Sequence, residues 1–197
     1  MIILYLIFVF LVLRFTVTLF NFISNPKLPA SARHYNDLVS ILIPARDEEH
    51  TILNLLQSIR DQDYENYEVI ILDDASGDAT FDICEDFCRD DHRFKVVRGL
   101  TLAEGWLGKN YACDQLSRMA SGRYLMFLDA DDVVKRGLIN NTLHRMKLRS
   151  LTLLSLFADQ EMKSWGERIV VPLMHFLLFN LLPLRLVRLS KSSSFAA

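Results

Sequence analysis

Three clusters of charged side chains, each directly after a short apolar run, are the parts of this sequence that could do chemistry. They occupy residues 44–48, 73–74 and 129–132. Asp129 and Asp131 lie two positions apart across a turn, so both carboxylates can face one ion. No His or Cys lies nearby in the sequence, and oxygen ligands alone favour a hard cation, Mg²⁺ or Mn²⁺. Such an ion is a Lewis acid that can stabilise a diphosphate leaving group.

A single acidic turn is more often a helix cap or a solvated loop than a binding site. Three clusters that each follow an apolar run make a shared binding site the better interpretation. The apolar runs before them are typical of buried strands, and amphipathic stretches separate the runs. This alternation predicts an α/β fold, a mostly parallel sheet with helices on both faces. Ligands of such sheets bind beyond the carboxyl ends of the strands. We therefore expect the three clusters to meet at one edge of the sheet.

The same pattern locates the individual elements. Strands are predicted at 39–43, ending at Pro44, and at 67–72, 94–97 and 124–128, with a fifth at 151–157. Apolar residues at helical spacing between 52 and 59 predict a helix behind an acidic start at 47–49. Asp78 is expected to cap a second helix, which contains Cys84 and Cys88, and a third helix is expected to start near Gly108. The three cysteines have no metal-site spacing, which indicates buried thiols in a reducing compartment.

Composition excludes several classes of function. The chain has 197 residues, is 51% hydrophobic and carries a formal net charge of -2, which leaves no basic surplus for binding nucleic acid. No Gly-rich loop follows the first predicted strand, so the sequence has neither the dinucleotide fingerprint nor the Walker phosphate loop there. A dehydrogenase or an ATPase is therefore not expected.

Residues 1–24 are predicted to form a transmembrane anchor. This stretch is almost wholly apolar over about the 20 residues that a helix needs to cross the hydrocarbon, with Arg14 as the exception. A cleaved signal peptide and a core helix are the alternatives, but the basic start of the first and the polar stripe of the second are missing. Lys27 and Arg33 follow the anchor and no basic side chain precedes it, which places the rest of the chain in the cytoplasm.

A second apolar stretch covers residues 169–189. It contains Pro172 and Pro183 and has basic residues near both ends. This composition favours a helix that lies in the membrane interface over one that crosses the membrane. A core helix of the domain is the alternative.

Three motifs in order resemble those of the inverting family 2 glycosyltransferases. They are S-I-L-I-P-A-R-D-E-E at 40–49, I-L-D-D-A-S-G-D at 71–78 and F-L-D-A-D-D at 127–132, and the likeness covers roughly residues 38–156. It implies a GT-A fold, a nucleotide-sugar as donor, with a UDP-sugar expected first, a divalent cation (Mn²⁺ or Mg²⁺), and transfer with inversion. The residues that it assigns to the nucleotide-sugar site are Pro44, Arg46, Glu48, Asp73, Asp74, Lys109 and Asp129.

The roles implied by the resemblance differ among these residues. Those of the first motif would shape the nucleoside pocket, Asp74 would accept from the base, and Asp73 would support that turn. Asp131, with Asp129 beside it, would hold the metal ion. Asp47 stands where Asn is common, which puts one local contact in doubt.

The stretch E-G-W-L-G-K-N-Y-A at 104–112 is similar to an element of membrane-bound members that glycosylate lipids, such as carotenoid-type and hopanoid-associated enzymes and ceramide glucosyltransferases. The similarity implies a lipid-like acceptor at the membrane. Lys109 lies near a predicted helix start, where it could contact the diphosphate. An ordinary solvated lysine at a helix cap is the alternative.

The expected organisation is an anchor at 1–24, a GT-A domain at 38–158, a hydrophobic interfacial segment at 159–190 and the start of an incomplete acceptor half at 191–197. The family's general base is a carboxylate well after the D-x-D motif, and Asp159, Glu161 and Glu167 all precede the second apolar stretch. We therefore expect a fragment, at the plasma membrane of a bacterium, that binds the sugar donor and transfers the sugar weakly or not at all. A non-catalytic binding module and a nucleotidyltransferase are the alternatives.

Overall fold

The computed structural model describes residues 1–24, 27–162 and 164–181, and the chain divides into two compact units. Leu28–Leu156 form the first unit, which carries the predicted site. The described parts of Met1–Lys27 and Phe157–Ala197 form the second. In the first unit, strands and helices alternate in the order β1 (Val39–Ala45), α2 (Ile52–Arg60), β2 (Tyr67–Asp73), α3 (Thr80–Asp90), β3 (Phe94–Arg98), α4 (Gly108–Met119), β4 (Tyr124–Phe127) and α5 (Leu138–Leu148).

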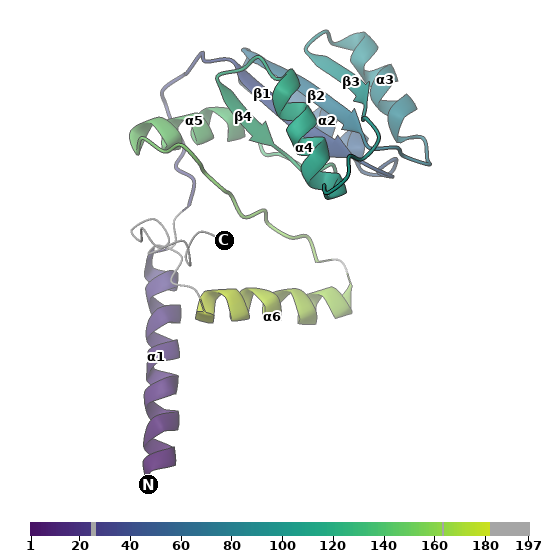
Figure 1. Cartoon of the computed structure of the whole chain (residues 1–197). Helices are drawn as coiled ribbons and strands as arrows, with labels where there is room; N and C mark the ends of the chain where they lie inside the picture. Colours follow the sequence, from purple (N-terminus) through teal and green to yellow (C-terminus); the bar gives the residue numbers. More distant parts are fainter. Residues whose placement is uncertain (25–26, 163, 182–197) are drawn as a thin grey trace. The chain divides into compact units, whose positions relative to one another are not determined.

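The strands of the described residues form one parallel sheet in the order β3-β2-β1-β4 (Figure 1). β1 is central and pairs with β2 on one side and with β4 on the other. The register places Ala45, the last residue of β1, opposite Asp73, the last residue of β2, and Asp73 opposite Arg98 of β3. The carboxyl ends of these strands therefore lie level with one another, as the alternating pattern predicts.

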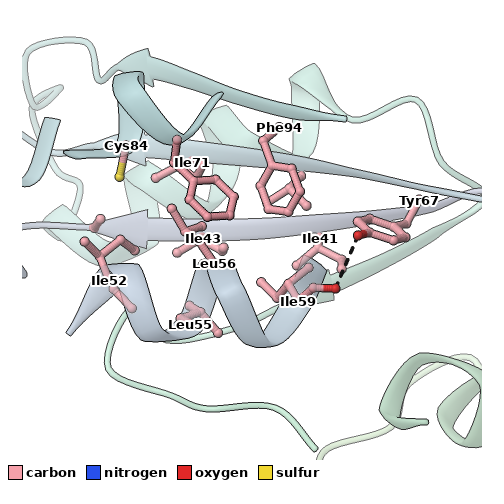
Figure 2. Close-up of a cluster of buried hydrophobic side chains, with 14 of the residues drawn as sticks. Ile41, Ile43, Ile52, Leu55, Leu56, Ile59, Tyr67, Ile71, Cys84 and Phe94 are labelled. Carbon is pink, nitrogen blue, oxygen red and sulfur yellow. Dashed lines mark hydrogen bonds between the residues drawn. The ribbon is translucent and has the colours of Figure 1, made fainter. Parts of the chain in front are cut away.

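Helices cover both faces of this sheet, because successive side chains of each strand point to opposite faces. On one face, Ile41 and Ile43 of β1 and Ile71 of β2 belong to a core with residues of α2, α3 and α5. Figure 2 shows the α2 side chains Leu55 and Leu56 in this cluster. On the other face, the cluster joins strand residues to α4 through Leu42, Ile70, Leu72, Ala112 and Leu116.

Aromatic residues close the first core near the amino ends of the strands. The ring of Phe94 meets that of Phe87 at 5.0 Å and that of Tyr67 at 6.3 Å, both edge to face. Tyr67 also donates its hydroxyl hydrogen to the carbonyl oxygen of Ile59 at 3.2 Å, the dashed line in Figure 2. Burial without this bond would leave a polar oxygen unpaired, so the bond lets a tyrosine occupy a core position.

One sequence-based expectation about elements is wrong, and another holds only in part. Residues 151–157 form no strand, and Leu153 and Phe157 are exposed. The stretch is apolar but pairs with no neighbouring strand, and a strand needs a partner to satisfy its backbone groups. The helix predicted from the apolar residues between 52 and 59 is confirmed as α2, but its first turn contains none of the acidic residues at 47–49, which lie before it. Those acidic residues instead form a loop that bonds to the loop after β2.

The second unit contains α1 (Ile2–Ser24) and α6 (Trp165–Leu181). Among the described residues, α1 is the one helix long and apolar enough to cross a membrane. Arg14 lies in it with its guanidinium over the ring of Phe10, 5.4 Å from the centroid. Helix α6 continues through Pro172. Residues 182–190 of the predicted interfacial segment, and all of 191–197, lie outside the described residues.

Candidate functional site

The loops that follow β1 and β2 are joined by reciprocal hydrogen bonds. The Gly77 amide donates to Asp47 Oδ1 at 2.7 Å, and the Ala79 amide donates to Glu49 Oε2 at 3.0 Å. In the opposite direction, the Asp47 amide donates to Ser76 Oγ at 3.1 Å. Each loop therefore satisfies backbone groups of the other, which fixes both at the carboxyl edge of the sheet.

Two further bonds extend this junction to the start of α3. The Glu49 amide donates to Asp78 Oδ2 at 3.1 Å, and the Glu48 amide donates to Thr80 Oγ1 at 2.8 Å. Asp78 also accepts the Thr80 amide at 3.0 Å, but the N-cap residue of α3 is Ala79, so Asp78 lies one position before the cap that the sequence predicts for it. The hydroxyl bond from Thr80 lowers the pKa of Asp78 most, with the backbone bonds adding to it. Ser76 and Thr80 were missed as junction residues, although small polar residues in a turn were the available signal.

The predicted nucleoside-pocket residues of the first motif are placed at this junction. Pro44 is the sixth residue of β1 and half-buried. Arg46 is exposed, with its guanidinium 3.8 Å from the carboxylate of Asp47. The carboxylate of Glu48 accepts the Thr51 hydroxyl at 2.5 Å. The guanidinium of Arg46 is thus the side chain of this motif that is held least and can turn toward a ligand.

Asp73 and Asp74 differ sharply in exposure although they are neighbours. The Asp74 amide donates to the Ala45 carbonyl at 2.8 Å, which ties the end of β2 to the end of β1. Asp73 is 2% exposed, and its Oδ1 is buried without a hydrogen-bond partner in the described part of the chain. An unpaired buried polar atom costs about 1–3 kcal/mol, so this oxygen can gain from a donor that reaches it. The carboxylate of Asp74 is partly exposed beside α4.

The amino end of α4 lies against these residues. A Cβ atom at Gly108 would stand 3.5 Å from Asp74 Oδ2, so the helix start and this carboxylate are in van der Waals range. The next residue, Lys109, places its Nζ 2.6 Å from Asp129 Oδ1. The hydrogen bond to Asp129 raises the pKa of Lys109, so the ammonium stays charged at neutral pH. Helix α4 therefore connects the cluster after β2 to the cluster after β4.

The third cluster forms a turn directly after β4. The Asp132 amide donates to the Asp129 carbonyl at 3.1 Å, and the Asp129 amide donates to Asp132 Oδ2 at 3.2 Å. Burial raises the pKa of Asp132, and the nearby carboxylates of Asp129 and Asp131 add to the rise. Asp131 is exposed. Carboxylates crowded in this way repel one another, and a nearby cation relieves the repulsion.

The described residues contain no group of three His, Cys, Asp or Glu side chains placed to hold a metal ion. Two carboxylates in a turn nevertheless suit Mg²⁺ or Mn²⁺ bound together with a diphosphate, because such ions take one or two carboxylates and complete their shell with phosphate oxygens and water. The oxygen ligands of Asp129 and Asp131 and the crowding at Asp132 fit this kind of ion.

Comparison with known proteins identifies the family of this chain. Residues 40–180 match the family described as "Glycosyl transferase family 2". The chain belongs to this family. Members of this family are glycosyltransferases, which are enzymes. The family membership predicted from the three motifs is therefore confirmed.

Individual relatives agree with this family assignment. The chain is 37% identical over 112 residues to an Escherichia coli UDP-Glc:alpha-D-GlcNAc-diphosphoundecaprenol beta-1,3-glucosyltransferase, over 56% of this chain and 42% of that protein. It is 34% identical over 111 residues to the beta-monoglucosyldiacylglycerol synthase of Trichormus variabilis, over 52% of this chain and 23% of that protein. The chain thus spans less than half the length of these family 2 relatives.

A solved structure confirms the predicted fold of this family 2 chain. The mannosyltransferase PcManGT from Pyrobaculum calidifontis, in complex with GDP-Man and Mn²⁺, superimposes with a TM-score of 0.56 at 21% identity. The match covers 71% of this chain and 42% of that one. The similarity establishes the shared GT-A fold, a parallel sheet with helices on both sides.

Proposed function

We propose that this chain binds a nucleotide-sugar, with a UDP-sugar as the first candidate, together with Mn²⁺ or Mg²⁺, for inverting transfer of the sugar to a lipid-like acceptor at a membrane. The observation that carries the proposal is the convergence of Asp74, Lys109 and Asp129 at one edge of the sheet, from three different segments of the chain. Open α/β sheets bind ligands at this edge. Membership of family 2 supports the reaction class.

The proposed sugar-donor site divides into two parts. The joined loops after β1 and β2 form the nucleoside part, with Pro44, Arg46 and Glu48 around the base and Asp74 as an acceptor for it. Asp73, which is 2% exposed at the end of β2, would support the turn that presents Asp74. The start of α4 and the turn after β4 form the diphosphate part.

The diphosphate part needs positive charge to offset both the phosphates and the carboxylates. A cation held by Asp131 and Asp129 would supply Lewis-acid stabilisation of the departing diphosphate. Lys109 adds an ammonium at the amino end of a twelve-residue helix, where backbone amides and the helix dipole favour anions. These residues bind and orient the diphosphate, and the chain's own carboxylates set where the cation lies.

The acceptor and the location are proposed from the relatives and from α1. The names of two relatives specify lipid acceptors or lipid products, a diphosphoundecaprenol and a glucosyldiacylglycerol. α1 is apolar over a span long enough to cross a bilayer, and Lys27 and Arg33 follow it. We place the site on the cytoplasmic side of a bacterial plasma membrane, anchored by one pass of α1.

The test is calorimetric binding of UDP and UDP-sugars to the detergent-solubilised chain, with and without Mn²⁺. We expect binding that depends on Mn²⁺ and is weakened at least tenfold by Asp131→Ala. Asp90→Ala is the matched control, because Asp90 is an exposed carboxylate at the carboxyl-terminal end of α3 and lies outside the three site motifs. Binding unaffected by Asp131→Ala, in protein whose circular dichroism shows a folded domain, would overturn the metal assignment.

The reaction class has a separate test. Nucleoside triphosphates in place of the nucleotide-sugar should release no pyrophosphate, since release would favour a nucleotidyltransferase. Incubation of membrane lipids with a radiolabelled UDP-sugar measures transfer directly. A folded chain that binds no nucleotide at all would contradict the proposed function as a whole.

A further inference from the structure

The loop between β3 and α4 exposes several large apolar side chains. Leu100 is 64% exposed, Leu102 53%, Trp106 42% and Leu107 73%. We call residues 99–107 the apolar loop. Single exposed apolar residues are ordinary on protein surfaces, but four within eight positions concentrate exposed apolar side chains in one loop, and such concentrations mark interaction sites.

The apolar loop is held in place, so this exposure is a feature of the folded domain. At its beginning, the Leu100 amide donates to Oε1 of the buried Gln115 at 2.8 Å. At its end, the Trp106 amide donates to the Ala103 carbonyl at 3.2 Å, and the ring of Trp106 lies 5.4 Å from that of Tyr111 in α4. α4 therefore fixes both ends of the loop, and the leucines are presented to the outside.

The position of the apolar loop ties it to the proposed sugar-donor site. Its last residue, Leu107, directly precedes Gly108, which lies beside Asp74, and Lys109, which pairs with Asp129. Whatever covers the loop therefore lies beside the diphosphate part of the site. An acceptor that approaches this part of the site comes close to the same surface.

The composition of the loop favours a bilayer as its partner. Leucine and tryptophan side chains around a single charged residue, Glu104, match the interfacial region of a membrane, where Trp is enriched. The loop lacks basic residues, so contact with it depends on apolar burial and not on anionic lipid headgroups. The chain also carries its own route to a membrane, because the apolar helix α1 ends at Ser24 and the folded domain begins at Leu28.

We propose that the apolar loop inserts into the interfacial region of the membrane and presents the diphosphate part of the site to the bilayer surface. This inference rests on the membrane attachment given in the proposed function. It goes further in naming the surface of the folded domain that touches lipid, and it gives Leu100, Leu102, Trp106 and Leu107 a role in positioning the site relative to a membrane-bound acceptor.

The two tryptophans of the chain, Trp106 and Trp165, allow a direct test. The Trp165→Phe variant leaves Trp106 as the reporter in the full chain, reconstituted into phosphatidylcholine liposomes with or without dibrominated acyl chains. We expect blue-shifted Trp106 emission, at least twofold quenching by the brominated lipid, and little quenching by aqueous iodide. The reciprocal Trp106→Phe variant reports the contribution of Trp165.

The outcomes separate this inference from the proposed function. If the chain floats with the liposomes but brominated lipid leaves Trp106 emission unchanged, the loop faces water or protein and the inference is wrong. If the chain does not float, the membrane attachment fails as well, while UDP binding measured in detergent still tests the sugar-donor site.

A second pair of variants tests the leucines. Leu100→Ser with Leu102→Ser should at least halve the quenching of Trp106 by brominated lipid. UDP affinity in detergent should stay within twofold. Leu153→Ser, at an exposed apolar position outside the loop, is the control. Equal quenching in the double variant and the control would overturn the role of the leucines.

Discussion

Removing the charge of Lys109 should change the affinities for metal and for nucleotide in opposite directions. Without nucleotide, Lys109 Nζ lies 2.6 Å from Asp129 Oδ1 and competes with any cation for that carboxylate. With a diphosphate present, the same ammonium can turn to the phosphate oxygens and release Asp129 for the metal. Lys109→Met, which keeps an unbranched side chain one atom shorter and without charge, therefore removes a competitor from the binding of metal and a ligand from the binding of nucleotide.

The size of each change in affinity follows from the solvent exposure of the side chains of Lys109 and Asp129. The side chains of Lys109 and Asp129 are 64% and 56% exposed, so their pair is a surface ion pair worth about 0.2–1 kcal/mol. Freeing Asp129 should thus tighten binding of Mn²⁺ alone by up to about fivefold. A hydrogen bond from a charged group contributes about 1.5–3 kcal/mol, discounted here for exposure to about 1–2 kcal/mol. UDP affinity in the presence of Mn²⁺ should fall by about five- to thirtyfold.

Electron paramagnetic resonance of free Mn²⁺ measures the first affinity, and calorimetry with UDP at saturating Mn²⁺ measures the second. Lys95→Met, at an exposed lysine of β3, is the control and should change neither. A variant that binds Mn²⁺ alone more weakly than wild type would refute the competition. Unchanged UDP affinity would refute the contact with the diphosphate.

Three further predictions concern the domain that carries the site. Asp47→Ala should weaken UDP binding several-fold because it leaves the Gly77 amide unpaired, whereas Asp47→Asn should bind as wild type; calorimetry compares the two variants. Gly122→Ala should lower the free energy of unfolding, measured in urea, by about 1–3 kcal/mol, because its Cβ would stand 2.6 Å from the Ser40 amide nitrogen. Gly77→Ala, whose Cβ would meet no atom closer than 3.7 Å, should lower it less. Glu68→Gln should lower the free energy of unfolding by about 1 kcal/mol at pH 7, and this difference should disappear from unfolding curves as the pH falls through the lowered folded pKa of Glu68.

The pH dependence at Glu68 follows from its surroundings. Burial alone would raise the pKa of this carboxyl, but hydrogen bonds from Ser40 and from the amide and hydroxyl of Ser121 outweigh burial and lower the pKa. A carboxyl whose folded pKa is below its unfolded value stabilises the protein above the unfolded pKa. That stabilisation is lost as the pH falls through the folded pKa. An unchanged difference between wild type and Glu68→Gln at low pH would contradict this account.

The arrangement of strands was predictable where local pattern and burial agree. Residues 39–45 and 67–73 are apolar on both faces, as a sheet covered by helices requires, and both became strands within two residues of the expected ends. The apolar stretch at 151–157 has the same composition without a partner strand. An apolar composition indicates that a segment can form a strand. Whether it does depends on a partner strand, whose residues lie far away in the sequence. The order β3-β2-β1-β4 is likewise a property of tertiary packing.

Helix α5 is an element that the sequence pattern does not reveal. It contributes Ile139 and Leu143 to the core, one turn apart, while Asn140 and Thr142 between them are also buried. Buried polar residues hide the apolar period that identifies a helix in a sequence. Asn140 is buried because its side-chain amide donates to the carbonyl of Arg33 at 2.7 Å and its Oδ1 accepts the amide of Tyr35 at 3.1 Å. These partners lie more than 100 positions away, which no local pattern could indicate.

In the proposed site, too, some features follow from the motifs and others depend on contacts in the folded structure. The motifs locate the carboxylates, but the bonds that hold their loops involve partners from other motifs, and Asp47 illustrates the consequence. Its φ of 56° lies in the left-handed region, which Asp and Asn adopt more readily than most residues, and its Oδ1 accepts the Gly77 amide. An Asn side chain offers the same oxygen at the same conformation. Asp47 therefore makes a bond that Asn could also make at this position, and the departure from the motif leaves the junction of the two loops intact.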